Sequence, residues 1–249
     1  MKCLIVGAGG HGRVVLDILL RAGEHKIVGF VDSNPDCIGR HVDGQPVHGD
    51  LTSIPRLRDE MGVQGAVVAI GSNGVRRNFA ERIEDLGLTL VNAIHPSANL
   101  ARNVTLGSNI VISAGALVCA HCQIGDSVIL NTGCIIDHES MVGTASHICP
   151  GARLAGRVTV ESGAFVGIGA TVIQNIRIGC EAIVGAGAVV IRDVAPMSTV
   201  VGVPASEIKI TPDSDELTRW MLPEFIRATL PPPSGRQENA GVPSHPIRT

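Results

Sequence analysis

An aliphatic residue recurs every six positions through the middle of this chain without a slip. The fifteen positions are Leu106, Ile112, Val118, Ile124, Leu130, Ile136, Val142, Ile148, Leu154, Val160, Val166, Val172, Ile178, Val184 and Val190. A period of six fits neither a lone helix nor alternating strands, but it fits short strands that are joined by tight turns and stacked in parallel. The repeat therefore predicts a parallel β-solenoid.

Small residues and glycines accompany this repeat. A mostly small residue stands two positions before each aliphatic, and glycine often follows it, as at Gly107 and Gly125. Small side chains fit the corners of a narrow prism, and bulky rings have little room there, in keeping with 2% aromatic residues and no tyrosine. Cys122 and Cys134 occupy small-residue positions, so core packing explains them better than a zinc site, and no metal is expected.

A glycine motif opens the chain. "KCLIVGAGGHG" reads as a strand that runs into a glycine turn, and the helix-like "RVVLDILLRAG" and a second strand, "KIVGFVD", follow it. Gly7, Gly9 and Gly12 match G-x-G-x-x-G, and Asp32 ends the second strand, a pattern that brings backbone amides to a phosphate. Only about one mononucleotide-binding half fits before the repeat, so one nucleotide is favoured over NAD.

Charge and length narrow the partners. The 249 residues carry a net charge of −3 with no block of like charges, which argues against a nucleic-acid or membrane partner. The N-terminal apolar run ends in glycines, unlike a signal peptide, and no apolar stretch approaches 18 residues. Seven scattered cysteines form no disulfide framework. We therefore expect a cytoplasmic protein with small-molecule ligands and no membrane insertion.

Several motifs resemble one enzyme family over about residues 2 to 209. They are "GAGGHG", "AIGSNGVRR", "LNTGCIIDHES", "ASHICPGA", "FVGIGATV", "IVGAGAVV" and "VVGVPA". The chain resembles the hexapeptide-repeat sugar O- and N-acetyltransferases, which include those of UDP-4-amino-sugars, GDP-perosamine and sialic acid. The resemblance implies an α/β Rossmann-like mononucleotide-binding domain over 1–96, a left-handed parallel β-helix over 97–205 and a C-terminal extension over 206–249. It also implies a homotrimer that uses acetyl-CoA.

Site residues follow from the resemblance by position. It implies that the nucleotide-sugar is held by Gly9, Gly10, His11, Asp32, Ser33, Gly71, Asn73 and Asn131. It implies an acetyl-CoA cleft lined by His147, Ile168 and Ala186, although glycine is common in the family at the position of Ala186. His138, Glu139 and Asn131 are the implied catalytic group.

The chemistry of acetyl transfer gives these residues roles. An amine that attacks a thioester loses a proton as the C–N bond forms, and His138 is the candidate base, with Glu139 fixing its tautomer. Asn131 would orient the amine, and His147 would donate to the thioester oxygen. Asn131 and Asp137 each follow an inward aliphatic, a position that suits a turn residue; for Asn131 function and turn are equally open, whereas for Asp137 the turn is favoured.

Rival functions remain at this stage. O-acetylation of a sialic acid or related sugar would use the same fold. A γ-type carbonic anhydrase would use His121, His138 and His147 as zinc ligands, but it would leave the front domain without a role. A non-catalytic nucleotide-sugar-binding protein is the third alternative. Residues 206–249 are expected to form a short helix and then a disordered Pro-rich tail.

Overall fold

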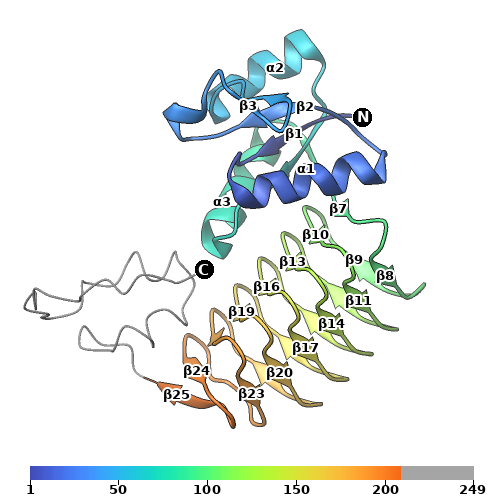
Figure 1. Cartoon of the computed structure of the whole chain (residues 1–249), viewed down its shortest axis with the longest axis vertical. Helices are drawn as coiled ribbons and strands as arrows, with labels where there is room; N and C mark the ends of the chain where they lie inside the picture. Colours follow the sequence, from blue (N-terminus) through green and yellow to red (C-terminus); the bar gives the residue numbers. More distant parts are fainter. Residues whose placement is uncertain (209–249) are drawn as a thin grey trace, which may run out of the picture. The chain divides into compact units, whose positions relative to one another are not determined.

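The computed structural model describes residues 1–208. It contains an α/β domain followed by a β-solenoid of about six coils (Figure 1). The expected helix and Pro-rich tail fall almost wholly within 209–249 and lie outside the described residues. Among residues 1–208 we find no helix long and apolar enough to span a bilayer.

The front domain is built on a parallel sheet in the order β2-β1-β5-β6. Its strands are β1 (Lys2–Val6), β2 (Lys26–Val31), β5 (Gly65–Val68) and β6 (Thr89–Leu90). Its helices are α1 (Gly10–Ala22), α2 (Ile54–Met61) and α3 (Asn73–Asp85), with short 3-10 turns at Pro35–Cys37 and Leu51–Ser53 and a small hairpin of β3 (His41–Val42) and β4 (Gln45–Pro46). The strand, glycine turn and helix predicted from the first residues are all present.

Glycines in the first turn divide into two kinds. A side chain on Gly12 would place its Cβ 2.0 Å from the carbonyl oxygen of Gly7, and one on Gly7, whose φ is +104°, would meet the carbonyl of Ala69 at 2.9 Å. These two glycines allow β1, α1 and β5 to pack closely. A Cβ on Gly9 or Gly10 would meet no described atom within 4 Å, so the backbone of these two residues is open to a ligand.

The solenoid consists of three parallel sheets, which we call faces 1, 2 and 3 in the order the chain visits them. Face 1 contains β7 (Ala93–Ile94), β10 (Val111–Ile112), β13 (Ile129–Leu130), β16 (His147–Ile148), β19 (Phe165–Val166), β22 (Ile183–Val184), β24 (Thr199–Val201) and the antiparallel β25 (Ser206–Ile208). Face 2 contains β8 (Asn99–Leu100), β11 (Leu117–Val118), β14 (Ile135–Ile136), β17 (Arg153–Leu154), β20 (Thr171–Val172) and β23 (Val189–Val190). Face 3 contains β9 (Thr105–Leu106), β12 (Gln123–Ile124), β15 (Met141–Val142), β18 (Thr159–Val160) and β21 (Arg177–Ile178).

Three strands and three turns complete each coil, and paired residues are 18 positions apart, as in Val111 and Ile129. We name the turns by the faces they join: corner A lies between faces 1 and 2, corner B between faces 2 and 3, and corner C between faces 3 and 1. The first coil begins earlier than the predicted boundary at residue 97. The amides of Ala93 and His95 already bond the carbonyls of Ile110 and Ile112, each at 2.8 Å, so β7 belongs to the solenoid.

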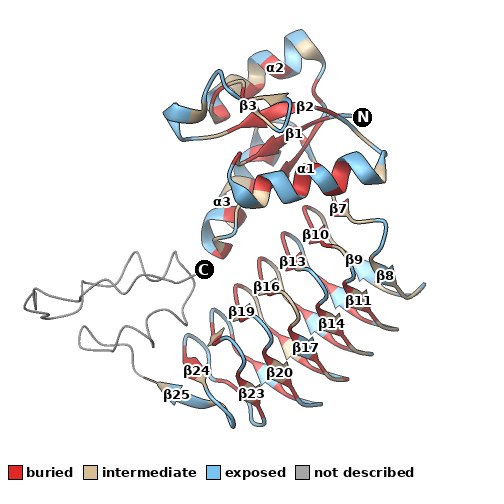
Figure 2. Ribbon diagram, viewed as in Figure 1, coloured by how far each residue is buried: buried red, intermediate tan, exposed pale blue. Residues whose placement is uncertain are grey.

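The aliphatic residues of the repeat fill the prism, as the sequence predicts (Figure 2). Cys122 and Cys134 are completely buried among them. The outward side chains of face 1 near its start, Ala93, Val111 and Ile129, are also buried, because they join the core of the front domain. The amide of Val68 adds a hydrogen bond of 2.7 Å to Oδ1 of Asn109. The front domain and the solenoid therefore share a continuous packed contact.

Candidate functional site

A cavity of about 230 Å³ lies at the carboxyl edge of the front sheet. Its lining is Val6, Gly7, Val31, Asp32, Ser33, Leu51, Ile70, Val75 and Phe79. The carboxylate of Asp32 accepts hydrogen bonds from the amide of Ala8 at 2.7 Å and from that of Asn34 at 2.8 Å. Asp32 thus braces the glycine turn and still offers its remaining lone pairs to the cavity. Ligands of open α/β sheets bind at this edge.

A second cluster forms where α1, the start of α3 and coil four meet. It contains His11, Arg76 and His147, and each histidine has one buried ring nitrogen without a described hydrogen-bond partner, Nε2 of His11 and Nδ1 of His147. The other ring nitrogen of His147 lies 3.2 Å from Nδ2 of Asn131. The ring of Phe165 packs edge-on against His147 with centroids 5.2 Å apart.

Both imidazoles are held neutral. Burial, with Arg76 adding to it, lowers the pKa of His11 to about 4. Burial, then the charge of Arg76 and the neighbouring His11, lowers the pKa of His147 to about 3, while the Gly71 carbonyl acts in the opposite direction. The amide oxygen of Asn131 accepts from the amide of Thr132 at 2.8 Å, which turns Nδ2 toward His147. Nε2 of His147 therefore accepts from Asn131, and the proton of the neutral ring lies on the buried Nδ1.

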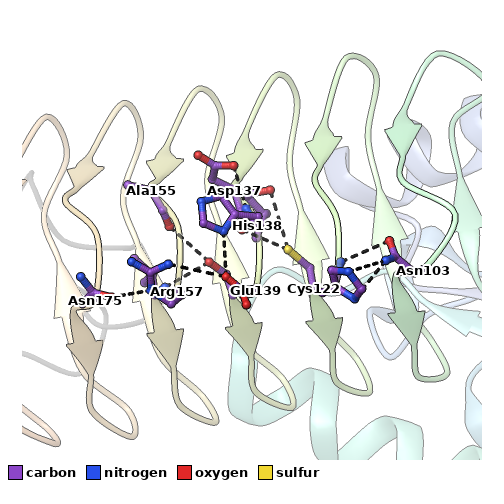
Figure 3. A network of polar contacts seen from close by, with 12 residues as sticks. Asn103, Cys122, Asp137, His138, Glu139, Ala155, Arg157 and Asn175 are labelled. Carbon is purple, nitrogen blue, oxygen red and sulfur yellow. Dashed lines mark hydrogen bonds and ion pairs between the residues drawn. The ribbon is translucent and has the colours of Figure 1, made fainter.

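His138 and Glu139 stand on corner B of coil three, exposed to solvent (Figure 3). Nδ1 of His138 lies 3.1 Å from Oε2 of Glu139. The hydrogen bond and charge of His138, together with Arg157 at 3.6 Å, hold the pKa of Glu139 below its usual range. With Nδ1 donating to this carboxylate, Nε2 of His138 presents a free lone pair, as a general base requires.

The turn that carries His138 is fixed from both sides. Oδ1 of Asp137 accepts from the amide of His138 at 2.7 Å, so Asp137 serves as the turn residue that the sequence favours. Inside the prism the thiol of Cys122 donates to the carbonyl of Asp137 at 3.1 Å (Figure 3). Outside it, the guanidinium of Arg157 bridges Glu139 to Oδ1 of Asn175, at 2.7 Å from the latter. His138 is thus mounted on a pre-organised support.

Gly156 lies directly beneath the imidazole of His138 on the next coil. A Cβ there would fall 2.5 Å from Nε2 and 2.6 Å from Cε1 of His138. Only glycine leaves the ring in its observed place, since a Cβ atom and a ring nitrogen cannot approach so closely. Sequence reasoning missed this residue, although its distance of 18 positions from His138 marks it as the neighbour on the adjacent coil.

We expect Gly156→Ala to lower kcat by about tenfold to a hundredfold, because the added methyl group displaces the imidazole of His138. The melting temperature should change little, since the backbone of Gly156 has no positive φ and the ring lies at the surface. Gly23→Ala is the control: this glycine follows α1 away from both corners and, at a φ of +69°, the change should cost stability rather than turnover. Unchanged kcat in Gly156→Ala would show that the position of the ring is unimportant.

Ile168 and Ala186 occupy equivalent places at corner A of successive coils. The side chain of Ile168 is 61% exposed, unusual for an isoleucine, and the carbonyl of Ile168 accepts from the amide of Gly187 at 2.8 Å. Asn131 lies at the same corner in coil three, and His147 lies on face 1 in coil four. Corner A therefore presents an apolar stripe that leads to Asn131 and His147.

The predicted site residues fall into two groups at different corners. Asn131 and His147 lie together at corner A and the adjoining face, whereas His138 and Glu139 lie at corner B, beyond β14. An extended chain of six residues spans up to roughly 20 Å, so one face of the prism separates them. Gly71 is open, but Asn73 is 2% exposed and spends its amide on the carbonyls of Gly163 and Ala164. Asn73 thus acts inside the protein and has no free side-chain donor for a nucleotide-sugar.

Known proteins share this architecture. The profile of the PglD N-terminal domain matches residues 2–83. A histidine variant of perosamine N-acetyltransferase from Caulobacter crescentus, solved with CoA and GDP-perosamine, is 41% identical, with 84% of this chain and 98% of that chain covered and a TM-score of 0.81. The chain belongs to the hexapeptide-repeat sugar acetyltransferase family.

Two further members of the family are similar to it. The acetyltransferase domain of PglB from Neisseria gonorrhoeae, solved with acetyl coenzyme A, is 33% identical, with 83% of this chain and 98% of that chain covered and a TM-score of 0.77. UDP-N-acetylbacillosamine N-acetyltransferase from Bacillus subtilis is 35% identical over 114 residues, 44% of this chain and 50% of that protein. The chain thus spans half or less of the length of the curated relatives that it matches.

A zinc site of the carbonic anhydrase kind has little support in the geometry. Among residues 1–208, no group of three or more His, Cys, Asp or Glu side chains is placed to hold a metal ion. His121 lies at corner B and contacts Asn103 at 3.0 Å, while His147 is half-buried on face 1 and contacts Asn131 at 3.2 Å. The histidines invoked for zinc therefore have other partners within the chain.

Proposed function

We propose that this protein is an acetyl-CoA-dependent N-acetyltransferase that acts on the amino group of a nucleotide-activated amino-sugar. The observation that carries the proposal is the exposed His138–Glu139 pair, whose geometry leaves a free lone pair on Nε2 of His138. The front cavity with Asp32 and Ser33 suits the nucleotide, and the stripe of Ile168 and Ala186 suits the pantetheine arm of acetyl-CoA. The relatives solved with CoA, acetyl-CoA and GDP-perosamine support the same substrates.

The two groups of residues become one site if the protein is a homotrimer. In a ring with threefold symmetry, a patch on one subunit meets a different patch on the next, so corner A of one solenoid can face corner B of its neighbour. Asn131 and His147 would then come from one subunit, and His138 and Glu139 from the next. Each trimer would hold three such sites.

Catalysis follows from these positions. The sugar amine attacks the thioester carbon, the C–N bond forms, and Nε2 of His138 takes the proton that the amine loses. The neutral His147 donates a hydrogen bond to the carbonyl oxygen as that oxygen gains negative charge, a contact worth about 3 kcal/mol when pre-organised. This contact requires its Nδ1–H, which is buried in the structure, to turn toward the substrate. The C–S bond then breaks, and the proton on His138 passes to the departing CoA thiolate. Glu139 stabilises the imidazolium in between.

Acetyl transfer from acetyl-CoA to a panel of sugars tests this function. The acceptors are GDP- and UDP-linked 4-amino-sugars, the matching sugars with a hydroxyl group in place of the amine, and a free sialic acid. We expect CoA release only with an amine, and a product heavier by one acetyl group. Transfer to the hydroxyl acceptors alone would establish O-acetylation. If none of the acceptors in the panel led to CoA release, the result would contradict the proposal.

A further inference from the structure

Arg76 is a buried cation without an acidic partner. It lies in the first turn of α3, its side chain is 0% exposed, and among the described residues it forms no ion pair. Burial lowers its pKa to about 9, which leaves the guanidinium charged at neutral pH. A buried charge of this kind is costly unless every donor is satisfied, so its retention needs an explanation.

Every nitrogen of the guanidinium is satisfied by oxygen atoms. The acceptors are the carbonyls of Ser127 (2.7 Å), Ile70 (2.9 Å), Gly71 (3.1 Å), Ala145 (2.9 Å) and Ser146 (3.3 Å), and Oδ1 of Asn73 (2.9 Å). These six acceptors engage all three nitrogens of the planar fork, with Nη2 sharing its two hydrogens among three of them, a geometry that lysine does not offer.

The acceptors belong to two different parts of the fold. Ile70 and Gly71 follow β5 at the edge of the nucleotide cavity, whereas Ser127 and the pair Ala145 and Ser146 lie in corner C of successive coils. Asn73, held by Arg76, reaches the next corner C turn at Gly163, at 2.8 Å. One buried pair of side chains therefore fixes α3 to three consecutive coils.

The buried pair of Arg76 and Asn73, which we call the clamp, adjoins the acyl-transfer residues. Ser146, whose carbonyl accepts from Arg76, immediately precedes His147, and the charge of Arg76 acts on both His147 and His11. The carbonyl of Gly71, a residue that the family resemblance implies for the nucleotide-sugar, accepts from the same guanidinium. Arg76 thus connects the cavity that would hold the nucleotide to the coil that would hold the acetyl group.

We propose that Arg76 is a positioning residue. It fixes the position of the nucleotide-sugar cavity relative to the acyl-transfer coils, which we call the register of the two parts, so that the sugar amine arrives at the thioester. The inference rests on the proposed function. A displacement of about 1 Å in such a register can lower turnover by roughly a hundredfold. A nucleotide-linked acceptor is anchored in the front domain, so its reaction depends on the register, whereas a free amino-sugar is not anchored there.

Arg76→Lys is the test variant, and Arg77→Lys is its matched control. Arg77 is the next residue on α3, but it is exposed, and its ion-pair partner among residues 1–208 is Glu181, at 3.3 Å. We expect Arg76→Lys to lower kcat with the nucleotide-linked amino-sugar by about tenfold to a hundredfold and to change the slower reaction with the free amino-sugar by less than about threefold. Arg77→Lys should match the wild type in both. Equal losses with both acceptors, or no loss with either, would overturn the proposal.

A distance measurement keeps this inference separate from the proposed function. Spin labels on non-canonical residues at Leu20 and Ile191, both exposed, report the separation of α1 from the solenoid, in trimers where labelled chains are diluted with unlabelled ones. We expect one narrow distance distribution in the wild type and in Arg77→Lys, and a broader one in Arg76→Lys with intact secondary structure. If Arg76→Lys broadens the distribution but the wild type transfers no acetyl group, the positioning role of Arg76 stands and the proposed enzyme activity is wrong. A narrow distribution in Arg76→Lys would show that the positioning role is wrong. Arg76→Met, which leaves six acceptors without donors, should broaden the distribution further or unfold.

Discussion

Replacing His138 by alanine should lower kcat by about 10²–10⁴, the usual effect of losing a positioned general base. The fold and the binding of acetyl-CoA should remain nearly intact, because the side chain is exposed and lies outside the aliphatic prism. Steady-state kinetics with saturating acetyl-CoA and amino-sugar measure the change, and thermal unfolding shows that the protein is folded. Turnover at the wild-type level would show that His138 is only a turn residue.

His121→Ala is the matched control for this experiment. His121 is an exposed histidine at the same corner of the solenoid, one coil earlier, and its ring contacts Asn103 instead of a carboxylate. We expect its kcat to equal that of the wild type. A large loss in His121→Ala would instead favour the zinc interpretation, which needs that imidazole as a ligand.

The pH profile separates His138 from the other histidines of the site. In the wild type, log(kcat/KM) should rise with pH on the acid side, and that limb should vanish in His138→Ala once the ionisation of the acceptor amine has been fitted separately. His11 and His147 cannot supply this limb, because burial lowers their pKa values to about 4 and about 3, and both are already neutral above these values. His147→Ala should reduce kcat and retain the limb, since the role proposed for His147 is to donate a hydrogen bond.

The architecture could be predicted from the sequence because each six-residue repeat contains an aliphatic residue at the same position. Fifteen aliphatics in register leave one geometry for the chain, and their small neighbours explain the buried Cys122 and Cys134. Ile94 and Leu100 continue the same phase ahead of Leu106, so the solenoid starts before the predicted boundary at residue 97. Tertiary pairing with β10 and β11 decides their structure.

The division of the site into two corners was harder to predict. Asn131, His138 and His147 are close in sequence and read as one cluster. With 18 residues to a coil, Asn131 and His147 are almost one full coil apart and therefore meet, while His138 is one corner further along. The phase of the repeat contains this information once the number of hexads in a coil is known.

Arg76 shows the limit of sequence reasoning. It lies within the "GSNGVRR" motif beside Arg77, and the sequence of this motif does not distinguish the buried arginine from the exposed one. Burial and the arrangement of carbonyl acceptors arise only when α3 packs against corner C. Asn73 is the same case: its identity suggests a ligand contact, and its packing assigns it to the clamp.

The central claim is that corner A of one subunit and corner B of another form each active site, and mixing two inactive variants tests it most directly. His138→Ala and His147→Ala each lose at least about a hundredfold in kcat. In trimers assembled at random from equal amounts, about one subunit boundary in four joins an intact His138 to an intact His147. Light scattering and thermal unfolding first confirm that both variants are folded trimers.

We predict that co-assembly of the two variants restores about a quarter of the wild-type activity, whereas the same variants mixed without subunit exchange stay at the level of each alone. If instead each chain carried a complete site, every site in the mixture would lack one histidine. Activity that remains at about 1% of wild type after verified co-assembly would contradict the shared active site.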